Sequence, residues 1–108
     1  MRVEVVCYAN ICRSPVAAEL LRERSSSNVE VRSSGLFAQE GAHVDPVMLS
    51  RLQDRFPNLH THSSRRTSVV ALTEVDLVLV MERSHKAFLS ASAPYLAGRV
   101  MLFRTWRA

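Results

Sequence analysis

Two apolar runs dominate the hydrophobic pattern of this 108-residue chain and predict its central strands. Residues 2–7 contain three closely spaced valines, and residues 77–81 are apolar on both faces of an extended chain. β-Branched residues favour strands, and a continuous apolar run is typical of a parallel strand covered on both sides. Two further strands are predicted, over residues 29–32, which alternate apolar and polar, and over residues 99–103.

The first predicted helix follows directly after the strand over residues 2–7. Ser14 stands where an N-cap residue belongs, and Pro15 fits the first helical turn. Four apolar residues recur at helical spacing beyond it: Val16, Ala17, Leu20 and Leu21. The helix is expected to end near Arg24, where a polar run of serines begins.

More helical segments are predicted downstream. Asp45-Pro46 is a good cap and first-turn pair for a helix that stops at Pro57. Thr67 or Ser68 is expected to cap a short helix, and residues 84–91 predict another. Strands and helices therefore alternate along the chain.

This alternation predicts an α/β fold. We expect a four-stranded parallel sheet with helices on both faces, wound in both directions from its first strand. At 108 residues the chain is expected to form a single domain over residues 1–108. Ligand sites of such sheets lie at the carboxyl ends of the strands, and Cys7 stands at one of these ends.

Composition indicates the cellular compartment in which the protein is expected to work. Hydrophobic residues make up 47% of the chain, but no apolar stretch approaches the length of a membrane span. Glu4 interrupts the N-terminal run too early for a signal segment. Cys7 and Cys12, the two cysteines, do not resemble a secreted disulfide framework. A cytoplasmic protein with a reactive thiol is expected.

The net charge of +4 comes mostly from arginine, with thirteen Arg against one Lys. The arginines are scattered along the chain, apart from Arg65-Arg66, and few aromatic residues accompany them. This pattern argues against nucleic-acid binding. A basic rim around an anion site explains it better.

The segment from Cys7 to Arg13 has the spacing of a phosphate cradle. The five residues between them can curl so that their backbone N–H groups point inward: Tyr8, Ala9, Asn10, Ile11 and Cys12. The Arg13 guanidinium can close the ring with two parallel hydrogen bonds, and the following helix adds its positive end. These groups all favour the anionic form of the Cys7 sulfur, which makes Cys7 a candidate nucleophile.

The string Cys-x-x-Asn-x-Cys-Arg-Ser-Pro from Cys7 resembles the signature of the low-molecular-weight protein tyrosine phosphatases. The resemblance extends along most of the chain through the segments Ser33 to Leu36, Gly41, Asp45-Pro46, His62 to Arg65, Asp76 to Glu82 with His85, and Gly98 to Leu102. The pattern is most similar to the bacterial branch associated with capsule and exopolysaccharide production. It implies a cytoplasmic hydrolase without a cofactor or metal, whose partner is a phosphotyrosine protein such as a bacterial tyrosine autokinase.

The same resemblance implies roles for individual residues. Cys7 would attack phosphotyrosine and form a phosphocysteine, while Arg13 holds the transferring phosphoryl group. Ser14 would donate its hydroxyl to the thiolate. Asn10 would brace the loop, supported by Ser33 from the next strand end.

One departure from the family pattern concerns the end of the sequence. Family members continue into an Asp-Pro loop, which supplies a general acid, and a final helix, whereas this sequence stops at Trp106-Arg107-Ala108. Asp45-Pro46 matches the start of a helix instead. We therefore expect anion binding and turnover of esters with good leaving groups, but weak activity on phosphotyrosine. An uncovered sheet would also favour self-association.

Alternatives remain open at this stage. A cradle without an acid could be a non-catalytic phosphate-binding or phosphotyrosine-binding module. Arsenate reduction, which a related fold performs, would require further cysteines, and none follows Cys12. Cys12 itself could be a packed small residue or could form a reversible disulfide with Cys7.

The remaining polar residues indicate surfaces and not a metal centre. His60 and His62 lie two apart in a polar stretch, residues 58–66, that is expected to be a loop. His85 is interpreted as structural or as part of a rim. Candidate rim residues are Tyr8, Phe37, Gln39 and Glu40.

Overall fold

A parallel sheet organises the computed structural model, which describes residues 1–96 and 98–103. The strands are β1 (Arg2–Cys7), β2 (Glu30–Gly35), β3 (Leu77–Val80) and β4 (Val100–Leu102). They pair in the order β2-β1-β3-β4, and every pairing is parallel. The apolar runs in β1 and β3 occupy the two central positions, as the sequence predicts for strands covered on both faces.

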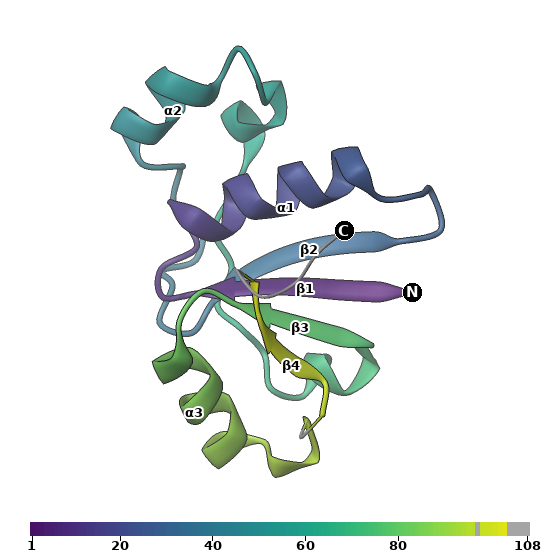
Figure 1. Cartoon of the computed structure of the whole chain (residues 1–108). Coiled ribbons are helices and arrows are strands. Elements are labelled where there is room, and N and C mark those ends of the chain that lie inside the picture. Colours follow the sequence, from purple (N-terminus) through teal and green to yellow (C-terminus); the bar gives the residue numbers. More distant parts are fainter. Residues whose placement is uncertain (97, 104–108) are drawn as a thin grey trace.

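Helices cover both faces of this sheet (Figure 1). The α-helices are α1 (Arg13–Arg24), α2 (Pro46–Leu52) and α3 (Arg83–Ser92), and three short 3₁₀ turns are η1 (Pro57–Thr61), η2 (Ala71–Glu74) and η3 (Pro94–Leu96). Figure 1 shows α1 and α2 on one side of the sheet and α3 on the other. The predicted four-stranded α/β fold with helices on both faces is confirmed.

Two apolar clusters form the core, one on each face. Val3 and Val5 of β1 pack with Leu21 of α1, whereas Val6, on the opposite face, packs with Leu89 of α3. Alternation of side chains along β1 therefore divides its three valines between the two clusters.

Two helix predictions need correction. Ser14 is not the N-cap of α1: the helix begins at Arg13, Cys12 stands at the cap position, and the Ser14 hydroxyl is used elsewhere. The second helix ends at Leu52, short of Pro57, and none of its residues is buried, so little packing stabilises a longer helix. Asp45 does cap it, since its side chain accepts a hydrogen bond from the Met48 amide at 3.1 Å.

The predicted short helix after residue 67 is the 3₁₀ turn η2, and the Ser68 hydroxyl accepts from the Ala71 amide. No helix within residues 1–96 and 98–103 is long and apolar enough to cross a membrane. The expected end of the chain at Trp106-Arg107-Ala108 lies outside the described residues.

Candidate active site

The candidate site lies where β1 passes into α1, at the carboxyl edge of the sheet. Residues 8–12, which we call the 8–12 loop, connect Cys7 to the first residue of α1. Cys7 is the register partner of Gly35, the last residue of β2, so the ends of two parallel strands meet beside the loop. This is the edge at which α/β sheets bind ligands.

Cys7 is buried, with 3% of its surface exposed, and its sulfur has two polar neighbours. The Ser14 Oγ lies 2.8 Å from Cys7 Sγ, and the Asn10 amide donates to the same sulfur at 3.2 Å. The fold therefore brings Cys7, Asn10 and Ser14 together as a group.

Asn10 is the most constrained residue of the loop. It is fully buried and has a φ of 59°, in the left-handed region that Asn tolerates better than most residues. Its side-chain amide donates to Ser14 Oγ at 2.8 Å and to Ser33 Oγ at 3.0 Å. Its Oδ1 and backbone carbonyl accept from the Arg65 amide and from His62 Nε2, at 2.9 and 2.8 Å.

Gly35 allows the loop to lie close against β2. A Cβ atom at residue 35 would stand 2.8 Å from backbone atoms of Tyr8, Ala9 and Asn10, nearer than real Cβ contacts allow. Because the neighbouring atoms are backbone, a side chain here could not be accommodated by a rotamer change.

Arg13 does not lie free beside Cys7. Its Nη2 donates to Glu82 Oε1 at 2.8 Å, and both side chains are about half exposed. The hydrogen bond and charge of Arg13 lower the pKa of Glu82. His85, one helical turn further on, is buried, and this burial lowers its pKa, although the nearby Glu82 acts in the opposite direction.

An open cavity of about 420 Å³ lies over this edge of the sheet. It is lined by Tyr8, Arg13, Leu36, Phe37, Glu82, Ser84, His85 and Phe88. The Phe37 ring lies 5.2 Å from the rings of both Tyr8 and Phe88, centroid to centroid. Three partly exposed aromatic rings thus form one wall, and the guanidinium of Arg13 provides a cation on the same cavity.

The remaining predicted site residues lie either in the 8–12 loop or on the surface outside the cavity. Ala9, Ile11 and Cys12 are partly buried in the loop, and both cysteines are free thiols. Gln39 and Glu40 are exposed but do not line the cavity, and the Glu40 carboxylate accepts from the Arg66 amide.

Several contributors to the site were not predicted from the sequence, His62, Arg65, Glu82 and Phe88 among them. His62 and Arg65 were assigned to a surface loop, yet they bind Asn10. Glu82 and Phe88 were given no place in the cavity. A signal was available for Glu82, which directly follows the most strand-like run of the chain and so falls at the ligand-binding edge.

Fold and site together place a buried thiol under the 8–12 loop, followed by Arg13, at the carboxyl edge of an α/β sheet. A family model for low molecular weight phosphotyrosine protein phosphatases matches residues 2–108. The chain belongs to this family, which confirms the resemblance seen in the sequence.

Individual relatives agree with this membership. The low molecular weight protein-tyrosine-phosphatase Wzb of Salmonella typhimurium is 40% identical over 105 residues, which cover 97% of this chain and 70% of that protein. The structure of Vibrio vulnificus Wzb in complex with benzylphosphonate matches with a TM-score of 0.87 and 30% identity, covering 97% of this chain and 74% of that one. The arginine phosphatase YwlE, in a mutant with a phosphorylated active-site serine, matches with a TM-score of 0.85 and 30% identity, over 94% and 68%.

Proposed function

We propose that this protein hydrolyses phosphotyrosine in proteins through a covalent phosphocysteine at Cys7. The observation that carries the proposal is the environment of Cys7 Sγ, which receives the Asn10 amide at 3.2 Å and lies 2.8 Å from the Ser14 hydroxyl. A buried sulfur with such donors is suited to carry negative charge, and the thiolate is the nucleophilic form.

The chemistry would proceed in two steps. Cys7 Sγ attacks the phosphorus, so that a P–S bond forms, the bond to the tyrosine oxygen breaks, and that oxygen leaves and takes a proton. A water molecule then attacks the phosphocysteine, the P–S bond breaks, and phosphate and the thiolate are released. The phosphorylated active-site serine of the YwlE mutant supports a covalent intermediate.

The 8–12 loop and Arg13 would hold the phosphoryl oxygens during both steps. Backbone amides of the loop and the positive end of α1 provide fixed donors, and the guanidinium can bind two oxygens at once. Because Arg13 is bound to Glu82, an incoming oxyanion has to share or take over this guanidinium.

The cavity supports an aromatic substrate. Tyr8, Phe37 and Phe88 present rings on one wall, and such rings pack favourably against another ring. We therefore propose a phosphotyrosine segment of another protein, such as a tyrosine autokinase, as substrate.

The described part of the cavity offers no free carboxylic acid to protonate the leaving oxygen. Among the cavity-lining residues that the structure describes, Glu82 alone has a carboxylate, and it is paired with Arg13. Asp45 is used as a helix cap. We propose that residues 1–108, as a phosphatase domain, cleave activated aryl phosphates well and phosphotyrosine slowly, since a positioned acid contributes about a hundred- to ten-thousandfold.

Steady-state rates on p-nitrophenyl phosphate, a phosphotyrosine peptide and a phosphoarginine peptide test this proposal. We expect clear turnover of the first, at least about a hundredfold lower kcat/KM for the second, and none for the third. Acid quenching followed by mass spectrometry should detect a phosphate on Cys7, and Cys7→Ala should abolish turnover. Faster cleavage of phosphoarginine than of phosphotyrosine would overturn the substrate assignment.

A non-catalytic phosphate-binding module is the second candidate, and the pairing of Glu82, a cavity-lining carboxylate, with Arg13 favours it. Phosphate would then protect Cys7 from alkylation while no ester is turned over. Measured turnover of p-nitrophenyl phosphate would exclude it.

A further inference from the structure

The polar segment 62–67 lies against the 8–12 loop and binds its most constrained residue. His62 Nε2 is 2.8 Å from the Asn10 carbonyl oxygen, and the Arg65 backbone amide donates to Asn10 Oδ1 at 2.9 Å. Asn10 in turn donates its own amide to Cys7 Sγ. One hydrogen-bonded residue therefore separates this segment from the sulfur.

Arg65 is fixed at both its backbone and its side chain. Its carbonyl oxygen accepts from the Gly35 amide at 2.9 Å, and its Nη2 donates to the Ser33 carbonyl oxygen at 3.1 Å. The same Nη2 lies 3.7 Å from Glu4 Oε1. Backbone and side-chain contacts together hold the Arg65 amide beside Asn10.

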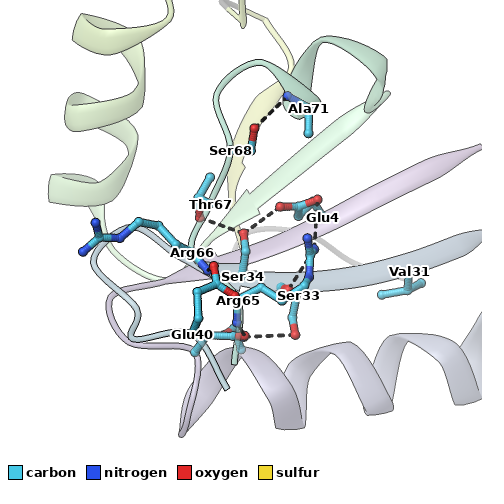
Figure 2. Close-up of polar contacts among 12 residues, drawn as sticks. Glu4, Val31, Ser33, Ser34, Glu40, Arg65, Arg66, Thr67, Ser68 and Ala71 are labelled. Atoms are coloured by element: carbon cyan, nitrogen blue, oxygen red, sulfur yellow. Dashed lines mark hydrogen bonds and ion pairs between the residues drawn. The ribbon is translucent and has the colours of Figure 1, made fainter. Parts of the chain in front are cut away.

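Glu4 is an unusual residue to find within a central strand. It lies between Val3 and Val5 in β1 and is only 4% exposed, so its carboxylate is buried on the α3 side of the sheet. The Ser34 hydroxyl donates to Glu4 Oε2 at 2.6 Å and lies 2.7 Å from Thr67 Oγ1. Figure 2 shows Ser34 between Glu4 and Thr67, with the Arg65 side chain directed towards Glu4.

Packing alone does not require this arrangement. A leucine at residue 4 would extend the apolar cluster of its face, and buried ion pairs contribute little to stability compared with apolar residues of similar size. The Glu4 carboxylate instead connects segment 62–67 to β1 in two ways. It pairs with the Arg65 guanidinium, and it accepts from the Ser34 hydroxyl, which in turn contacts the Thr67 hydroxyl.

We propose that Arg65 is a positioning residue for the reaction, anchored by the buried Glu4 and acting through Asn10 on the 8–12 loop. This inference rests on the proposed function, because the property that Arg65 controls is the geometry of the loop around Cys7 and its oxyanion.

Three measurements on each variant test the inference: the rate of Cys7 alkylation by iodoacetamide near neutral pH, the phosphate concentration that protects Cys7, and kcat and KM for p-nitrophenyl phosphate. All are made well below the melting temperature of the variant, so that only folded protein is compared. The variants are Arg65→Ala, Arg65→Lys, Glu4→Gln and the double variant Glu4→Leu/Arg65→Met. Arg66→Ala is the matched control, since this neighbouring side chain is exposed and only its backbone amide is bonded to Glu40.

We expect Arg65→Ala to lower kcat by about ten- to a hundredfold, the size that small misplacements of a site produce, and to slow alkylation and weaken phosphate protection. Arg65→Lys should recover part of each loss because it keeps a cation near Glu4, and Glu4→Gln should show a smaller loss than Arg65→Ala. Arg66→Ala should match the wild type. The double variant should restore the melting temperature without restoring phosphate protection.

Each contrary outcome has a distinct meaning. Lower melting temperatures with unchanged alkylation, protection and kcat would make Arg65 and Glu4 merely structural and overturn this inference alone. A double variant with wild-type reactivity would do the same, and it carries the test if Arg65→Ala does not fold. A wild-type Cys7 that neither reacts nor is protected by phosphate would overturn the proposed function as well.

Discussion

Arg13 Nη2 donates to Glu82 Oε1 at 2.8 Å across a sequence separation of 69 residues. The contact joins the residue that follows the 8–12 loop to the residue that precedes α3, at the mouth of the aromatic cavity. The arginine expected to bind the phosphoryl group therefore already has an anionic partner. Any oxyanion that enters the cavity competes with Glu82 for it.

Replacing this partner should strengthen oxyanion binding. Glu82→Gln retains an oxygen that can accept from Arg13 but removes the competing charge. We expect the inhibition constant of inorganic phosphate near neutral pH, where Glu82 is ionised, to fall by about two- to fivefold, as suits a half-exposed pair. Glu74→Gln, at an exposed carboxylate that pairs with Arg2, is the control. Weaker phosphate binding in Glu82→Gln would mean that the carboxylate orients Arg13 more than it competes for it.

The Ser14 hydroxyl should matter for the reactivity of Cys7 and not for the start of α1. Ser14→Ala removes the group 2.8 Å from the sulfur and the acceptor of one Asn10 hydrogen bond. We expect kcat on p-nitrophenyl phosphate to fall by about ten- to a hundredfold, the size of hydrogen bonds to charged groups. Ser50→Ala, the same change in α2, should leave kcat unaltered. A loss of stability with full kcat would restore the N-cap interpretation.

Phe88 is expected to contribute to substrate affinity. Its ring lies 5.2 Å from that of Phe37 and completes the aromatic wall. Phe88→Ala should raise KM for p-nitrophenyl phosphate by about two- to tenfold, the range of aromatic contacts, while the inhibition constant of inorganic phosphate stays constant. Tyr95→Ala removes another partly exposed ring outside the cavity and serves as control. Equal effects on KM in both variants would remove the specific role of Phe88.

His85 should make the fold sensitive to mild acid. Burial lowers its pKa in the folded chain, and its Nδ1 has no hydrogen-bond partner among the described residues. As pH falls below about 6.5, the imidazole of His85 binds a proton in the unfolded chain but not yet in the folded chain. The free energy of unfolding therefore decreases from this pH down to the lower pKa that His85 has in the folded chain. The melting temperature should therefore drop between about pH 7 and pH 5, and His85→Gln should reduce this drop. Parallel curves for the two proteins would contradict it.

Local patterns were sufficient to predict most of the fold. The valines of β1 and the apolar run of β3 predict central strands because burial on both faces requires such residues. The Cys-x5-Arg spacing also predicts where the 8–12 loop lies, because a strand end, a tight loop and a helix start all fall within one short segment. Asp45 was predicted as a cap because the amide that it binds, that of Met48, lies only three residues further along the chain.

Features that depend on distant residues could not be predicted in this way. Local preference alone predicted Ser14 as an N-cap, whereas the family resemblance assigned its hydroxyl to Cys7, from whose sulfur it lies 2.8 Å. The attachment of Arg65 to Asn10 joins residues 55 positions apart, and a polar stretch gives no periodicity from which to infer it. Glu4 offered a hint, since a lone carboxylate in an apolar strand requires a buried partner.

The close approach of Gly35 to the 8–12 loop has a practical consequence for protein engineering. At Gly35 itself the nearest atoms are main-chain atoms of Tyr8, Ala9 and Asn10, so no redesigned side chain of the loop could make room for a methyl group there. A designer who grafts this loop onto another parallel-sheet scaffold has to transfer a glycine to the end of the neighbouring strand as well. Scaffolds whose adjacent strand ends in a bulkier residue can be discarded before any active-site residue is chosen.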